Sequence, residues 1–125
     1  MPRTLTAPND REHVVTTTTT IKFAERVLAS YRVLAVGLPV ELRCPSPMSI
    51  LLELYIAEEE ALYPTSDGLG VVDAMHPSVK NRWIQALSQS GFVEQKGARF
   101  ALTEAGYKVV NDVLDLLFQV QRCLD

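Results

Sequence analysis

Four polar residues between Pro77 and Gly91 have the side chains that proteins use to read DNA bases. They are Ser78, Asn81, Arg82 and Gln85, and their spacing would place them on one side of a helix. Arginine offers a fork of donors to guanine, asparagine and glutamine pair with adenine, and serine can serve either purpose in the major groove. These four residues are therefore the candidates for contacts with base edges.

The segment that carries them has the start and stop signals of a helix. Pro77 suits the first helical position, where its missing N–H costs nothing, and Gly91 suits the left-handed position after the last turn. We predict a helix over residues 77–90. Its apolar side consists of Val79, Trp83, Ala86 and Leu87, with Ile84 at the margin. Trp83 belongs to this apolar side, which favours a core position over stacking on a base.

Charge is distributed along the chain in a way that favours a polyanionic partner. The 125 residues include 12 Lys and Arg and 15 Asp and Glu, for a net charge of −3. Residues 76–102 contain four cations and one carboxylate, Glu94, so this part is +3 and the remainder −6. The polar side of the predicted helix contains no acid, although a merely solvated surface would normally include some. Chance clustering is the alternative interpretation.

A β-hairpin and a final helix are predicted after residue 91. Residues 92–95 and 98–102 are typical of two short strands closed by a tight turn at Lys96-Gly97. Thr103 then occupies the place of an N-cap, and Glu104 puts an acid in the positively polarised first turn of the helix that follows. The predicted order is helix, hairpin, helix.

Three cations in this region are the candidates for phosphate contacts. Lys80 lies at the flank of the polar helix side, and Lys96 and Arg99 lie on or beside the hairpin tip. Such contacts add affinity and salt dependence without reading sequence. His76, in the turn before the helix, fits a cap or an exposed residue better than a phosphate ligand.

Three segments precede this region. Residues 1–20 lack helical periodicity, which predicts a mobile tail. The apolar spacing in residues 21–38 predicts an amphipathic helix. After a break at 45–47, a strongly apolar helix is expected to end in three glutamates at 58–60. We interpret these glutamates as a solvated helix end in preference to a metal site.

Residues 65–67 resemble the cap of a short supporting helix. That helix would continue through Val71, Val72 and Ala74 and would complete a helix-turn-helix with residues 77–90. Gly68 and Gly70 each cost on the order of 1 kcal/mol in a helix interior, so packing would have to stabilise this element.

The final helix has more apolar surface than one domain buries easily. Its apolar positions cover more than half of the helix circumference, which favours pairing of the terminal helices between two subunits. The residues expected in this dimerisation layer are Val27, Tyr31, Val113, Leu117 and Val120. The alternative is that both helices simply cover their own core.

Other function classes find little support in the sequence. There is no Gly-rich phosphate loop, metal-ligand spacing or nucleophile elbow, so we expect neither catalysis nor a cofactor. The apolar runs are too short for a membrane span, and the N-terminus lacks the apolar core of a secretory signal, so a cytoplasmic protein is expected. Cys44 and Cys123 are expected to be reduced thiols.

The order of these motifs resembles the MarR family of bacterial transcription regulators, over roughly the last two thirds of the chain. Leu87 followed by Gly91-Phe92-Val93 is similar to the family's recognition-helix exit. The residues Leu102-Thr103-Glu104-Ala105-Gly106 are similar to its Leu-Thr-x-x-Gly pattern after the wing. Short sphingomonad-type members also carry segments similar to residues 52–58 and 77–87 of this chain.

The resemblance implies a mainly α fold with a small β-wing. This fold is a winged helix-turn-helix in residues 21–125, with dimerisation helices at its N- and C-terminal ends. It also implies a homodimer on a pseudo-palindromic duplex and a possible small-molecule effector between the two layers. The hairpin tip at 95–98 is shorter than is usual in the family, which leaves Arg99 as the wing residue nearest the DNA. A winged-helix module that binds another protein and has lost DNA binding remains the alternative.

Overall fold

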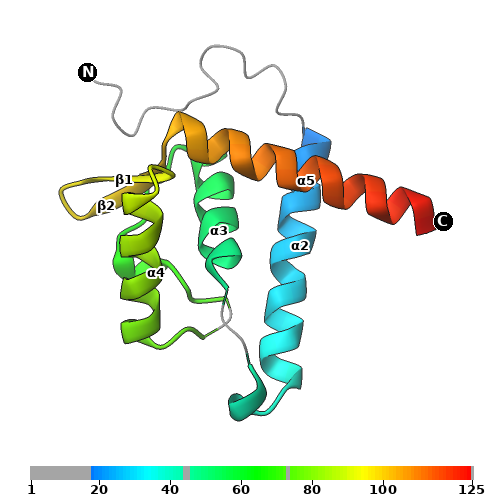
Figure 1. Ribbon diagram of the computed structural model, residues 1–125, viewed down its shortest axis with the longest axis horizontal. Helices are drawn as coiled ribbons and strands as arrows, with labels where there is room; N and C mark the ends of the chain where they lie inside the picture. The colour runs from blue at the N-terminus through cyan, green and yellow to red at the C-terminus, as the bar shows by residue number, and fades with distance from the viewer. Residues whose placement is uncertain (1–17, 44–45, 73, 125) are drawn as a thin grey trace.

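The chain folds into a mainly helical structure with one small antiparallel sheet. The computed structural model describes residues 18–43, 46–72 and 74–124 (Figure 1). The helices and strands within these ranges are α2 (Thr18–Gly37), α3 (Pro47–Glu60), α4 (Pro77–Gln89), β1 (Val93–Lys96), β2 (Arg99–Leu102) and α5 (Glu104–Leu124), with short 3₁₀ helices η2 (Val40–Leu42) and η3 (Ser66–Gly68). Residues 1–17 of the predicted tail lie outside the described residues, and Thr18 already begins α2.

Helix α3 forms the centre of the structure because nearly all of its sides are apolar. Ser46 caps its start by accepting the N–H of Met48 at 3.0 Å, and Pro47 follows at the first helical position. Figure 1 shows α3 between α2 and α4, with α5 running across the ends of these helices. The fully buried residues of α3 include Ser49, Ile50, Leu52, Leu54 and Tyr55. This helix therefore connects α4 to the rest of the core.

Aromatic contacts fix α5 against the other helices. The rings of Tyr55 and Tyr107 stack with centroids 5.0 Å apart, and the Tyr55 hydroxyl donates to Asn111 Oδ1. Nearer the end of α5, the ring of Phe118 meets that of Phe23 edge to face at 5.5 Å. Beyond this contact the last turns of α5 extend past α2 (Figure 1). No helix in the described ranges is both long and apolar enough to cross a bilayer.

The predicted hairpin is confirmed, but its turn lies one residue later than expected. Lys96 pairs with Arg99, so the two turn residues are Gly97 and Ala98. Gly97 has a φ of +61°. A two-residue turn with a positive φ at its first position takes glycine there, and this moves the turn from Lys96-Gly97 to Gly97-Ala98.

The predicted supporting helix through residues 71–74 is wrong. The structure has only the three-residue η3, followed by turns that lead to α4. Gly70 has a φ of +69° and Ala74 a φ of +52°, and neither value is compatible with a right-handed helix. The helix-turn-helix of the sequence prediction therefore lacks its first helix, and an irregular connection occupies that place.

The acidic end of α3 also differs from the prediction. Glu59 and Glu60 are exposed, as expected of a solvated helix end, but Glu58 is only 3% exposed. The Tyr63 hydroxyl lies 3.5 Å from Glu58 Oε2. Because α3 is surrounded by other elements, the helix turn that carries Glu58 still faces the interior.

Candidate nucleic-acid interface

Helix α4 packs on the core through one side, which is rotated slightly from the predicted one. Ile84 and Leu87 are buried, and Val79 and Trp83 are partly buried against the core. Trp83 thus lies against the core, as predicted. Ala86, which was predicted on the apolar side, is exposed, and Ile84 takes its place because the packed stripe is centred between Ile84 and Leu87.

The opposite side of α4 exposes the predicted base-reading residues. Ser78, Asn81, Arg82 and Gln85 are all exposed, and the neighbours Asn81 and Arg82 each lie three or four residues from Ser78 and from Gln85, so the four form a row along the helix. Within the described ranges, the side chains of Asn81, Arg82 and Gln85 make no hydrogen bond or ion pair. Their donors and acceptors are therefore available to another molecule, and no acidic residue of α4 lies beside them.

Ser78 differs from the other three because it is engaged at the start of the helix. The backbone N–H of Ser78 donates to Nδ1 of His76 at 3.1 Å, and the Ser78 hydroxyl lies 2.9 Å from the same nitrogen. His76 is therefore the N-cap of α4, one of the two roles predicted for it. A base contact by Ser78 would have to share its hydroxyl with this cap.

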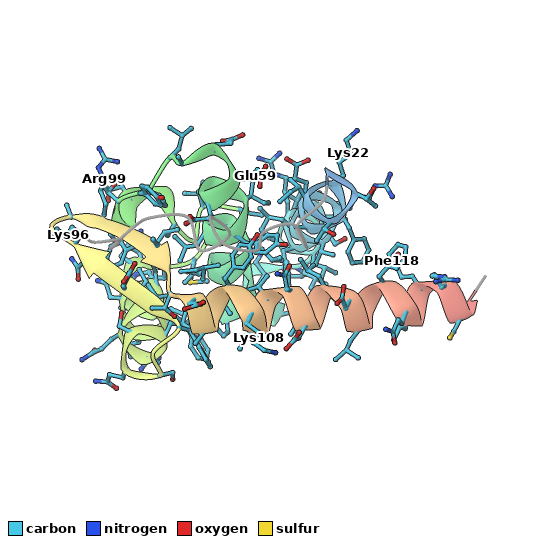
Figure 2. The ribbon with its side chains drawn as sticks, turned by 90° about the horizontal axis from the view of Figure 1, so that it is seen from above. Lys22, Glu59, Lys96, Arg99, Lys108 and Phe118 are labelled. Carbon is cyan, nitrogen blue, oxygen red and sulfur yellow. The ribbon has the colours of Figure 1, made fainter. Side chains whose placement is uncertain are left out.

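The three candidate phosphate ligands are in different situations. The Lys80 ammonium donates to the carbonyl oxygen of Ser66 at 2.7 Å, and the Arg99 guanidinium donates to that of Tyr63 at 2.6 Å. The Lys96 side chain is exposed and makes no hydrogen bond to the described residues. Figure 2 shows Lys96 and Arg99 at the hairpin end of the molecule, away from α2 and Phe118.

No sequence pattern indicates the residue that anchors the connection before α4. Glu53 of α3 accepts the backbone N–H of Gly70 at 2.8 Å and that of Val72 at 3.4 Å. These partners lie 17 and 19 residues further along the chain, so no local spacing pattern connects them. Glu53 lies on a helix that sequence periodicity predicts as apolar, where a single acid is unremarkable.

The connection after α4 is held by short-range backbone contacts. Gly91 has a φ of +83°, and two hydrogen bonds close the helix end, from Phe92 N–H to Leu87 at 3.0 Å and from Gly91 N–H to Ser88 at 3.1 Å. This is a Schellman motif, and it confirms the role predicted for Gly91.

The predicted N-cap of α5 is also confirmed. Thr103 Oγ1 accepts the N–H of Gly106 at 3.0 Å, and the Thr103 N–H donates to the Phe92 carbonyl at 3.0 Å. A Cβ atom on Gly106 would fall on that same carbonyl group, 2.9 Å from its carbon. The Leu-Thr-x-x-Gly pattern therefore has a physical basis here, because only glycine allows α5 to approach Phe92 so closely.

The predicted dimerisation residues divide into two groups. Val27, Tyr31 and Val113 are half-buried, and the first two pack against the core of their own chain. Leu117 and Val120, at the end of α5, are 37% and 58% exposed. Phe118, which lies on the side of α5 toward α2 (Figure 2), is 43% exposed despite its contact with Phe23. The apolar surface left uncovered on α5 is thus confined to its last turns.

Metal-ligating and thiol side chains form no further site in the part of the chain that the structure describes. No three His, Cys, Asp or Glu residues there come close enough to hold a metal ion. Cys123 is exposed near the end of α5, and Cys44 lies outside the described residues. No known protein family matches the sequence, and no curated protein or solved structure is similar to it at a significant level.

Proposed function

We propose that this protein is a sequence-specific DNA-binding transcriptional regulator that inserts α4 into the major groove of duplex DNA. The observation that carries the proposal is the row of Asn81, Arg82 and Gln85. These side chains are exposed, make no hydrogen bond or ion pair within the described part of their own chain, and have no acid beside them on α4. Side chains of these types make bidentate contacts with purine edges.

The residue roles follow from these positions. Arg82 donates to guanine O6 and N7, and Asn81 and Gln85 pair with adenine. Lys96 can contact a phosphate without giving up a hydrogen bond of its side chain to the described residues. Lys80 and Arg99 hold carbonyl oxygens of their own chain, but an ammonium has three donors and a guanidinium five, so each retains donors for a phosphate. In this arrangement the hairpin acts as a short wing and the protein resembles a MarR-like winged helix, with an irregular connection before the recognition helix.

A homodimer is part of the proposal. The exposed end of α5, with Leu116, Leu117 and Val120, supplies apolar surface for a second copy. A two-fold dimer would place two copies of α4 roughly 34 Å apart and would bind a pseudo-palindromic site. Changing Val120 to Asp should then convert a dimer to a monomer in sedimentation, whereas Val71→Asp, at a similarly exposed position, should not. A wild-type protein that sediments as a monomer would contradict the dimer.

A second candidate is a protein-interaction module without DNA binding. The observation that favours it is the exposed apolar end of α2, where Val33, Leu34 and Val36 are 68%, 55% and 77% exposed. An apolar contact of this kind responds little to salt, whereas DNA binding through cations weakens steeply. A salt series therefore distinguishes the two functions.

The deciding experiment is selection of binding sites from random duplex DNA with purified protein. We expect an inverted repeat to be enriched, and the affinity for it to fall with salt. Arg82→Ala should lose that binding by about 1–3 kcal/mol per contacted guanine. Arg26→Ala, which removes the same charge from an exposed position on α2, is the matched control and should bind like the wild type. Absence of an enriched sequence, or equal binding by both variants, would refute the proposal.

A further inference from the structure

The connection between α3 and α4, described for residues 62–72 and 74–76, is tied to the rest of the protein by charged side chains from three elements. Glu53 of α3 accepts the N–H groups of Gly70 and Val72, Lys80 of α4 donates to Ser66, and Arg99 of β2 donates to Tyr63. Backbone bonds in the described part of the segment close its turns, as from Met75 N–H to the Gly70 carbonyl at 2.9 Å, and join it to β2, from Phe100 N–H to the Pro64 carbonyl at 2.9 Å. Regular secondary structure therefore contributes little to its shape.

Of the three charged side chains, Glu53 is the one that joins the central helix to the approach of α4. A Cβ at Gly70 would lie 3.1 Å from Met75 Cβ and 3.2 Å from Lys80 Cδ, so Gly70 sits directly against both side chains. Gly70 therefore connects Glu53 to the start of α4. Glu53 binds its N–H, and Gly70 packs against Met75, just before α4, and against Lys80, in the first turns of α4. Asn81 and Arg82 follow Lys80 immediately in the chain.

The two ends of α4 are consequently fixed by different groups. Ile84 and Leu87 bury the C-terminal half in the core, whereas no residue of the first turn of α4 is fully buried and only Val79 packs partly against the core. The carboxylate of Glu53 forms charge-assisted hydrogen bonds, which are stronger than those between neutral groups. It is thus well suited to set the distance between the first turns of α4 and α3.

We infer that Glu53 is a positioning residue for α4: its carboxylate holds residues 70–72 and thereby orients Asn81 and Arg82 for base contacts. The part of the inference that concerns base contacts rests on the proposed DNA-binding function. The anchoring of residues 70–72 by Glu53 can be tested without DNA. Glu53→Gln keeps the shape of the side chain but removes its charge and one of its two acceptor oxygens. Glu59→Gln, on an exposed position of the same helix, is the matched control for the change in net charge.

The first test measures amide hydrogen exchange and chemical shifts of the full-length, ¹⁵N-labelled protein. In Glu53→Gln the amides of Gly70 and Val72 should exchange about tenfold faster than in the control, as expected for loss of a hydrogen bond to a charged acceptor. Apart from residue 53 and its neighbours on α3, shift changes should be confined to residues 69–82, with Val110 and Leu114 unaffected. Unchanged exchange at Gly70 and Val72, or equal acceleration throughout the core, would overturn the inference.

The second test measures binding to the selected duplex. Glu53→Gln should bind it about tenfold more weakly than Glu59→Gln, because misplacement of α4 loses contacts of the kind made by one bidentate pair. Equal binding by the two variants would show that Glu53 holds the connection without positioning α4. If the wild type selects no site, the DNA function fails, and the exchange result alone decides whether Glu53 anchors residues 70–72. Should Glu53→Gln not fold, Glu53→Asp withdraws the carboxylate by one methylene and gives the same readouts.

Discussion

The two connections of α4 are built from different interactions. After α4, Gly91, Thr103 and Gly106 close a compact junction between α4, the hairpin and α5, which is held by hydrogen bonds between backbone groups and by the uncharged hydroxyl of Thr103. Before α4, residues 62–72 and 74–76 follow an irregular path, and the side chains of Glu53, Lys80 and Arg99 bind backbone groups along it. One connection depends on the shape of the backbone, and the other depends on charge.

This difference has a consequence for the proposed interface. Contacts between backbone atoms change little with ionic conditions or with a bound polyanion, so the hairpin should keep its orientation relative to α4 and α5. Lys80 and Arg99, in contrast, belong both to the connection before α4 and to the set of candidate phosphate ligands. The connection before α4 is therefore the part of the structure that DNA binding can influence, and substitutions in the two connections should have different effects.

The largest effect is expected at the junction after α4, from Gly106→Ala. The new Cβ would fall on the Phe92 carbonyl, and backbone atoms cannot move aside without separating α5 from the hairpin. We expect a loss of about 3 kcal/mol in the free energy of unfolding, measured with urea. Gly37→Ala, where the Cβ meets no atom within 4 Å, is the control and should change stability by less than about 0.5 kcal/mol. Similar effects of the two substitutions would show that the junction is loosely packed.

The junction after α4 is also the part that sequence reasoning describes best. Pro77, Gly91 and Thr103 have roles that depend on neighbours a few residues away, so residue type and spacing were sufficient to predict α4, its end and the start of α5. Residue type and spacing predict the hairpin on the same grounds, although its turn lies at Gly97-Ala98 and its strands begin one residue later than expected. The mainly helical fold with a small antiparallel sheet is confirmed for this reason.

The connection before α4 could not be predicted because its determinants are distant in sequence. The supporting helix was expected from a cap-like Thr65 and the apolar residues Val71 and Val72, but the bonds from Glu53 stabilise a path that is not helical. The burial of Glu58 likewise depends on what surrounds α3. For the candidate interface, residue type predicted the exposed row on α4, whereas the engagement of Lys80 and Arg99 depends on tertiary contacts.

In the connection before α4, the largest effect is expected from Gly70→Ala. The substitution places a side chain at a φ of +69° and within 3.1–3.2 Å of Met75 and Lys80. We expect a loss of about 2 kcal/mol, of which roughly half is the cost of the left-handed backbone and the rest crowding. Gly97→Ala has a similar φ of +61° but meets no atom within 4 Å, so it isolates the backbone cost. If Gly70→Ala and Gly97→Ala lower the free energy of unfolding in urea equally, the side chains of Met75 and Lys80 move aside without destabilising the protein.

A smaller effect is expected from Lys80→Met, which retains the stem across Gly70 but removes the ammonium that donates to Ser66. The loss should be about 1 kcal/mol, as for a hydrogen bond from a partly exposed charged group. Lys22→Met, at an exposed position on α2, should leave stability nearly unchanged. Amide exchange of the 3₁₀ segment Ser66–Gly68 should increase in the first variant alone. If both variants unfold at the same urea concentration, the bond to Ser66 contributes nothing to the connection.

The smallest effect, with the opposite sign, is expected at the residue where α3 ends. Ala61 has a φ of +53°, and the N–H groups of Ala61 and Leu62 bond to Glu58 and Ala57 in the same closing pattern that Gly91 and Phe92 form after α4. Glycine relieves the left-handed strain but adds freedom to the unfolded chain, so Ala61→Gly should stabilise the protein by about 0.5 kcal/mol. Ala29→Gly, at an exposed position inside α2, should instead destabilise it by about 1 kcal/mol. Urea unfolding of both variants distinguishes the two signs, and a loss in Ala61→Gly would mean that α3 does not end in this left-handed turn in solution.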